Sequence, residues 1–158
     1  MDLLARKVPM KSLSAYNATL EEIEKTIAIA ASDTVLSTYA DELSQALATL
    51  RTTTETLLGA MLEKDIDLAL SNSVKYLDLF GHVIIAWMWL RQANAAAQAL
   101  GSANSDDERN FYQGKLQAAQ YFFHWELPTV AQDLVLLRNM DDTCLNMKAE
   151  WFWWLWLT

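Results

Sequence analysis

Apolar side chains recur every three or four residues over most of the chain, which is the spacing of one face of an α-helix. The longest such stripe lies in residues 34–63 and consists of Leu36, Tyr39, Leu43, Leu47, Leu50, Leu57 and Met61. The pattern predicts four main helices and a shorter fifth, at residues 13–31, 34–63, 66–100, 105–127 and 129–139. A one-sided stripe about 45 Å long, at about 1.5 Å per residue, needs long partner helices to cover it. We therefore predict an all-α fold, an up-down helical bundle.

Residues at the expected helix ends support these boundaries. Asp33 is a typical N-cap ahead of the second helix, and Ser105 with Glu108 forms a capping-box pattern ahead of the fourth. Gly101 follows the third helix, where a C′ glycine is common. Pro128 is expected to end or kink the fourth helix, because proline has no N–H to donate.

The third predicted helix is apolar on every side in its middle, where residues 83–90 are eight apolar side chains in a row. A membrane span needs about 20 apolar residues. Three polar or charged side chains keep this run too short: Asp78, His82 and Arg91. We expect a central, fully packed helix that also packs against something outside this chain. Gly81 and Gly114, which lie within helical patterns, are expected to allow close helix packing.

Composition agrees with a helical protein, since 53% of residues are hydrophobic, 20% are charged, and Gly (4) and Pro (2) are rare. The formal net charge of −8 argues against a nucleic-acid partner, because an acidic surface repels phosphates. The single cysteine, Cys144, excludes an internal disulfide. Residues 1–12 carry charges and lack the apolar run of a signal peptide, so we expect an intracellular, cytoplasmic protein.

Residues capable of chemistry are scattered. His82 and His124 lie on different predicted helices with no partner at ligand spacing, and no Glu-x-x-His pair occurs, so a structural role is expected for both histidines. The adjacent acids are expected to be solvated or to cap helices: Asp41-Glu42, Asp106-Asp107-Glu108 and Asp141-Asp142. The aromatic runs at 87–89 and 121–125 are interpreted as core packing. Neither a nucleophile elbow, a P-loop nor a dinucleotide fingerprint is present. We predict no catalytic, cofactor-binding or metal-ligating residue.

Several segments together, in their order and spacing, are similar to one known family. The segments are Tyr76-Leu-x-Leu-Phe-Gly81, Ala86-Trp-x-Trp-Leu-Arg91, Phe111-Tyr-x-Gly-Lys-Leu116, Ala119-x-Tyr-Phe-Phe123 with Leu127-Pro128, and Leu137-x-x-x-Asp-Asp-Thr143. Over about residues 1–150 the chain resembles the extra carboxy-terminal helical domain of one branch of the acyl-CoA dehydrogenase family. In many members a Tyr-Glu-Gly-Thr loop supplies the glutamate base, and Asp2-Leu-Leu-Ala-Arg-Lys-Val8 looks like the segment just after it. The resemblance implies that the catalytic glutamate, the flavin-binding β-domain and most of the acyl-CoA pocket have no counterpart here.

The function implied is that of a C-terminal structural and oligomerisation domain of an FAD-dependent acyl-CoA dehydrogenase, which oxidises acyl-CoA to enoyl-CoA. We expect residues 1–150 to form one helical-bundle domain that holds no cofactor and is inactive alone, FAD belonging to the family's full-length enzymes. Its expected partners are the catalytic domains or another copy in a homo-oligomer.

An alternative is a stand-alone interaction module that docks a partner or a membrane interface through the Trp-rich tail, residues 151–158. The tail has no Lys or Arg, which weakens the case for an anionic membrane. An enzyme using buried carboxylates would require two acids facing each other in a cleft, and no spacing here suggests that.

Overall fold

The structure, a computed structural model, describes residues 1–63 and 65–152, and within these ranges it contains helices and no strand. The α-helices are α1 (Ser14–Ala30), α2 (Ser37–Leu62), α3 (Ile66–Ser71), α4 (Ser73–Leu100), α5 (Asp106–Tyr121) and α6 (Val130–Arg138). Two π-helical turns, η1 (Leu3–Lys7) and η2 (Phe122–Glu126), and two 3₁₀ turns, η3 (Leu127–Thr129) and η4 (Ala149–Trp151), complete the list. The predicted all-α class is confirmed.

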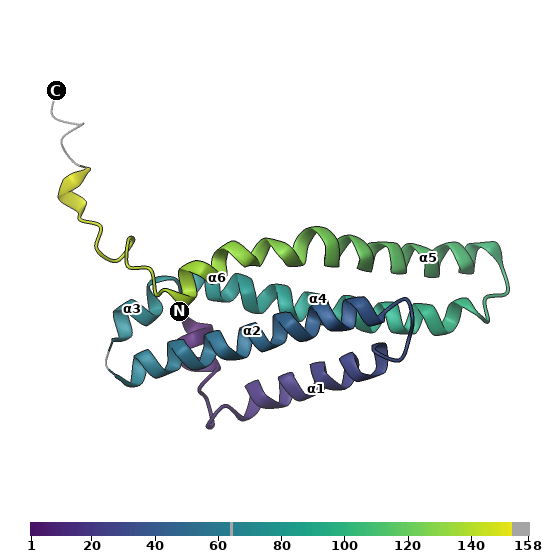
Figure 1. Cartoon of the computed structure of the whole chain (residues 1–158), viewed down its shortest axis with the longest axis horizontal. Helices are drawn as coiled ribbons and strands as arrows, with labels where there is room; N and C mark the ends of the chain where they lie inside the picture. Colours follow the sequence, from purple (N-terminus) through teal and green to yellow (C-terminus); the bar gives the residue numbers. More distant parts are fainter. Residues whose placement is uncertain (64, 153–158) are drawn as a thin grey trace.

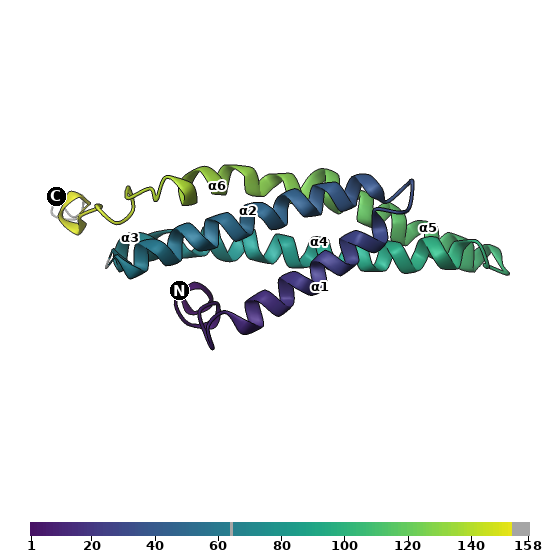
Figure 2. The ribbon, with the colours of Figure 1, turned by 60° about the horizontal axis from the view of Figure 1, so that its bottom comes forward.

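Each long helix reverses the direction of the one before it, so α1, α2, α4 and α5 form the predicted up-down bundle (Figure 1). The segment from α5 to α6 runs back along α4, and α1 lies along α2 and α4 (Figures 1 and 2). Helix α4 is central, because it contacts α1, α2, α5 and α6.

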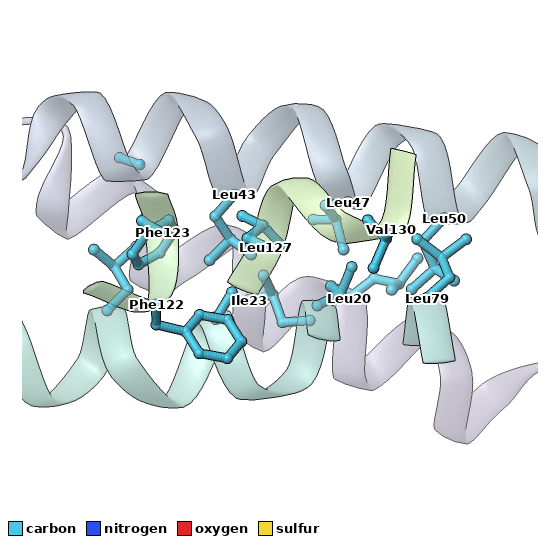
Figure 3. Close-up of a cluster of buried hydrophobic side chains, with 14 of the residues drawn as sticks. Leu20, Ile23, Leu43, Leu47, Leu50, Leu79, Phe122, Phe123, Leu127 and Val130 are labelled. Carbon is cyan, nitrogen blue, oxygen red and sulfur yellow. The ribbon is translucent and has the colours of Figure 1, made fainter. Parts of the chain in front are cut away.

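The core lies between α2 and α4 and is closed by α1 on one side and the η2–α6 segment on the other. In Figure 3, Leu20 and Ile23 of α1 lie beside side chains of α2 and of the η2–α6 segment. Five leucines of the predicted stripe are buried: Leu36, Leu43, Leu47, Leu50 and Leu57. Each stabilises the fold by about 1.5–3 kcal/mol through burial, so the stripe on α2 is a main source of stability.

The predicted third helix, 66–100, is broken at Asn72, and this expectation was wrong. Asn72 has φ −106° and ψ 28°, and its Nδ2 donates to the carbonyl of Asp141 at 2.7 Å. The Ser71 hydroxyl donates to the Leu68 carbonyl at 2.7 Å. Polar side chains that bond to nearby backbone groups compete with the helix ladder. The break therefore ties α3 to the segment that follows α6.

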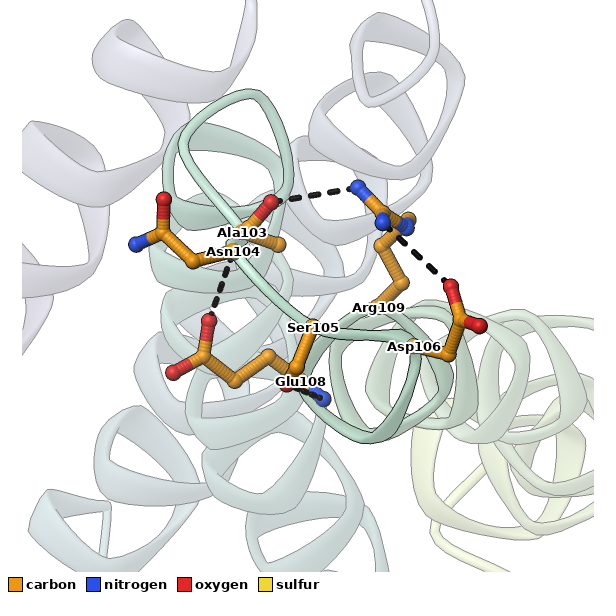
Figure 4. Close-up of polar contacts among 6 residues, drawn as sticks. All are labelled: Ala103, Asn104, Ser105, Asp106, Glu108 and Arg109. Carbon is orange, nitrogen blue, oxygen red and sulfur yellow. Dashed lines mark hydrogen bonds and ion pairs between the residues drawn. The ribbon is translucent and has the colours of Figure 1, made fainter.

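The predicted Ser105 cap of α5 forms, although Glu108 bonds to the Asn104 amide rather than to the amide of the N-cap residue itself, as a full capping box would (Figure 4). The Ser105 hydroxyl accepts from the Glu108 amide at 3.2 Å, and Glu108 Oε2 accepts from the Asn104 amide at 2.8 Å. At its far end, the predicted fourth helix changes to the π turn η2 before Pro128, where the Leu127 amide donates to the Phe122 carbonyl. Since Pro128 has no amide to continue the regular ladder, its neighbours adopt a wider turn.

Two other helix ends differ in their details. Asp33 Oδ1 accepts from the amides of Val35 (2.8 Å) and Leu36 (3.2 Å), so it caps the turn that leads into α2. Gly101 follows α4 directly, but its φ of −67° is right-handed, so the left-handed cap that favours glycine does not form. Instead, the Ser102 amide donates to the Ala99 carbonyl at 3.0 Å.

No helix in the described part of the chain is long and apolar enough to cross a membrane. Of the predicted Trp-rich tail, Trp151 and Phe152 are described and exposed. The rest of that prediction, residues 153–158, falls outside the described residues.

Candidate functional site

A cleft of about 460 Å³ lies between α2 and the segment running from η2 to α6. Its polar lining is Glu42, Gln45 and Thr49 from α2 together with His124 from η2. The remaining lining is mainly apolar and includes Phe123, Leu127 and Leu134. A cleft with an apolar floor and a few polar groups is the usual form of a binding site.

Glu42 is the unusual group of this cleft. Its Oε2 is buried and has no hydrogen-bond partner within the described residues. Burial raises the pKa of the Glu42 carboxyl, and the nearby His124 opposes this in part. The expectation that Asp41 and Glu42 are both solvated or capping was therefore wrong for Glu42, although Asp41 is exposed. The sequence contains one signal of this burial: Glu42 directly precedes Leu43 and so lies at the edge of the α2 apolar stripe.

The two histidines lie in different surroundings. His124 is exposed, and its ring meets the edge of Tyr39 with the ring centroids 6.0 Å apart. His82 is half-buried, its Nδ1 lies 2.8 Å from the Asp78 carbonyl, and its ring is 6.2 Å from that of Phe122. Both rings thus pack against aromatic neighbours, which agrees with the predicted structural role.

Inside the core, three hydroxyl groups form a buried network. Thr54 Oγ1 lies 2.8 Å from the Tyr76 hydroxyl and accepts from the Tyr16 hydroxyl at 3.2 Å. Thr54 also donates its hydrogen to the Leu50 carbonyl at 2.7 Å. Burial raises the pKa of both tyrosines, Tyr76 the more, and their bonds to Thr54 oppose this shift. The network holds α1, α2 and α4 together, and its neutral phenols are suited to structure rather than to proton transfer.

The aromatic runs pack in or against the core as interpreted, but only in part. In 121–125, Phe122 and Phe123 are buried, whereas Tyr121 and Trp125 are exposed and stack on each other with ring centroids 6.3 Å apart. Trp87 and Trp89 are half-buried. Trp87 Nε1 donates to the Thr26 hydroxyl at 2.7 Å, which fixes this ring between α1 and α4.

A row of apolar residues on the outward side of α4 is the other prominent feature. It consists of Val74, Leu77, Gly81, Ile85 and Met88, and we call it the α4 face. Val74 is 66% exposed, Leu77 53% and Ile85 46%. The prediction that this helix is central was correct, but the described residues 1–63 and 65–152 do not pack it fully. The sequence contains a signal of this apolar face, because these five residues recur every three or four positions with no charge among them.

The glycines of α4 and α5 do not serve the packing that we predicted. A Cβ built at Gly81 or at Gly114 would meet no atom within 4 Å. Neither glycine is therefore required by contacts between helices of the described chain.

Within residues 1–63 and 65–152, no group of three or more His, Cys, Asp or Glu side chains could hold a metal ion. In the first turn of α5, Glu108 accepts from the Asn104 amide, and Asp106 accepts from Arg109 at 3.3 Å. Asp141 and Asp142 accept hydrogen bonds from Thr143 and Asn146 of their own turn. These side chains complete local structure.

Comparison with known proteins identifies the bundle. Residues 19–148 match the family described as Acetyl-CoA dehydrogenase C-terminal like. The chain belongs to this family. It is also 32% identical, over 80 residues, to the broad-specificity linear acyl-CoA dehydrogenase FadE5 of Mycobacterium tuberculosis. The match covers 51% of this chain but 13% of the mycobacterial enzyme, so the chain spans a small part of that relative's length.

The family implies FAD in its complete enzymes, but the described side chains do not fit a flavin dinucleotide. A pyrophosphate is bound by amide groups at a helix N-terminus or by basic side chains. The cleft between α2 and the η2–α6 segment instead presents the Glu42 carboxyl above an apolar floor.

Proposed function

We propose that this chain is the C-terminal structural domain of an FAD-dependent acyl-CoA dehydrogenase, and that it supports the catalytic domains without supplying catalytic residues. Oxidation of acyl-CoA to enoyl-CoA would then be carried out by polypeptide outside this bundle, in the cytoplasm. The observation that carries the proposal is the family match across residues 19–148. Support for oligomer contacts is part of the same proposal.

Two features of the bundle support this role. Polar side chains form hydrogen bonds that stabilise the fold, as at the α5 cap and in the Tyr16–Thr54–Tyr76 network. The α4 face leaves apolar surface uncovered, which is expected where a domain packs on other polypeptide.

The test is to purify the chain alone and to measure flavin absorbance and turnover of acyl-CoA thioesters of several lengths with an artificial electron acceptor. We expect neither flavin nor turnover. Joined to the flavin-bearing catalytic domains of the mycobacterial relative, the chain should raise the temperature at which flavin is released. Stoichiometric flavin on the isolated chain, or turnover without added polypeptide, would refute the proposal.

A stand-alone interaction module is the second candidate, and the exposed Trp151 and Phe152 favour it. Deletion of residues 151–158 separates the two ideas. Loss of liposome or partner binding, with an unchanged far-UV circular dichroism spectrum, would favour the module. If binding and the far-UV circular dichroism spectrum are both unchanged by the deletion, the acyl-CoA dehydrogenase domain is favoured.

A further inference from the structure

The α4 face is the side of the central helix that its neighbours leave open. Helices α1, α2, α5 and α6 contact α4 elsewhere along its surface. Two charged side chains near the face are engaged in other directions. Lys75 Nζ lies 3.0 Å from Asp133 of α6, and the Arg91 guanidinium lies 5.4 Å from the centre of the Trp87 ring. The five residues of the face thus form an apolar strip, bordered by the half-buried Asp78, and an apolar centre with polar groups at its rim is characteristic of an interface.

Gly81 lies in the middle of this strip. Glycine inside a helix costs about 1 kcal/mol relative to alanine, and nothing in the described chain requires its lack of a Cβ. Its neighbours four residues away are apolar and exposed, with Leu77 before it and Ile85 after it, and the charged Asp78 lies three residues before it. The bare backbone at Gly81 thus leaves a notch between two exposed aliphatic side chains.

The exposed area of the α4 face distinguishes between a second copy of the chain and another domain of the same polypeptide as its occupant. Its apolar side chains expose on the order of a few hundred Å², the size of patch that marks an interaction site. A homodimer through this strip would bury about twice that area, less than the roughly 1,200 Å² of a specific, stable interface. Contacts between domains of one polypeptide are commonly about 600–1,500 Å². A covalent link makes such an area sufficient, because it gives the second domain a high effective concentration.

We propose that the α4 face docks on the catalytic domains of the same enzyme, and that an aliphatic or aromatic side chain of those domains enters the notch at Gly81. This inference rests on the proposed function. The amount of polypeptide outside the bundle supports this occupant, since the aligned segment accounts for 13% of the mycobacterial relative.

The test is cysteine footprinting in a Cys144→Ser background, which removes the exposed natural thiol. Leu77→Cys and Ile85→Cys report on the α4 face. The matched control is Ala48→Cys, an exposed position of α2 beside α1. Each variant is labelled with a thiol reagent twice. The first sample is the isolated chain, and the second is the chain joined to the flavin-bearing catalytic domains of the mycobacterial relative, in place of the region that it matches.

We expect labelling at positions 77 and 85 to slow by about tenfold or more in the joined enzyme, because reagent reaches a docked face only through opening of the interface. Labelling at position 48 should not change. If positions 77 and 85 keep the rate of the isolated chain while the joined enzyme still gains thermal stability, this inference fails and the proposed function survives. If the bundle adds no stability at all, the proposed function fails. Slowing that appears in the isolated chain and grows with its concentration would assign the face to a second copy and overturn the inference.

A pair of glycine variants provides a second measurement. Gly81→Leu and Gly114→Leu both fall where the fold leaves open space, so neither should destabilise the isolated chain. Gly81→Leu should weaken docking of the bundle by about tenfold or more, about 1.4 kcal/mol or more, because the notch is filled. Gly114→Leu should leave docking unchanged, because Gly114 has the polar Asn110 and Gln117 at helical spacing. Equal docking of the two variants would contradict a role for the notch.

Discussion

The buried hydroxyl of Thr54 holds two tyrosines at once, and this makes Thr54→Val an informative substitution. Valine has nearly the same shape, so the change removes hydrogen bonds without opening a cavity. Because Thr54 donates its only hydroxyl hydrogen to the Leu50 carbonyl at 2.7 Å, it can only accept from the tyrosines. Tyr76, like Tyr16, must therefore be a donor, and Thr54→Val leaves two phenol hydroxyls without an acceptor.

The cost follows from the burial of these groups. Tyr76 is fully buried, and Tyr16 is 7% exposed with the longer bond, 3.2 Å against 2.8 Å. A buried donor left without a partner costs about 1–3 kcal/mol, with Tyr16 at the lower end. We expect Thr54→Val to lower the free energy of unfolding by about 2–4 kcal/mol. For a chain of this size the melting temperature should fall by about 5–15 °C.

The adjacent residue gives a matched control with the opposite sign. Thr53 is as buried as Thr54, but its Oγ1 has no hydrogen-bond partner within the described residues. Thr53→Val should therefore be neutral or should stabilise by up to about 1 kcal/mol, because a buried unpaired hydroxyl is removed. Both variants are measured by urea unfolding followed by circular dichroism, with the slope of the transition checked for a change in the denatured state.

A double variant tests whether the orphaned tyrosine is the cause. In the Thr54→Val background, Tyr76→Phe should recover part of the lost stability, since it removes a hydroxyl that has no acceptor. In the natural background the same change should destabilise. Equal effects of Thr53→Val and Thr54→Val, or no recovery by Tyr76→Phe, would refute the hydrogen-bond assignment.

Three further predictions concern the cleft, a helix cap and the open glycines. Burial raises the pKa of Glu42 above the ordinary value of 4.5, so folding favours the protonated acid. The charged carboxylate therefore lowers the stability of the fold at neutral pH. This loss of stability disappears as the pH falls below 4.5, where the acid is protonated in the unfolded chain as well. Glu42→Gln should therefore raise the urea midpoint at pH 7 and lose this gain in acid, and an equal gain at both pH values would contradict the buried-carboxyl explanation. Ser105→Ala should cost about 1 kcal/mol of stability in urea unfolding, because the Glu108 amide loses its cap; an unchanged midpoint would contradict the capping geometry. Gly114→Ala should stabilise by about 0.5–1 kcal/mol in the same assay, since its Cβ enters open space, and destabilisation would show that this surface is crowded.

Features that depend on neighbouring residues could be predicted well. The segment predicted at 13–31 is α1 at Ser14–Ala30, and the segment predicted at 129–139 contains α6 at Val130–Arg138. The Ser105 cap forms as expected because its hydroxyl reaches an amide three residues away. The helical period likewise identified the leucines of α2 that form the core.

The sequence by itself determined the all-α class and the number of long helices, because helix propensity, caps and apolar periodicity act over a few residues. Only the tertiary structure decided the break at Asn72, the buried oxygen of Glu42 and the open side of α4. Asn72 bonds to Asp141, 69 residues further along the chain, and no local pattern contains that contact. Likewise, an apolar residue on α4 is buried or exposed according to which helices pack beside it, and this is settled only when the whole bundle assembles.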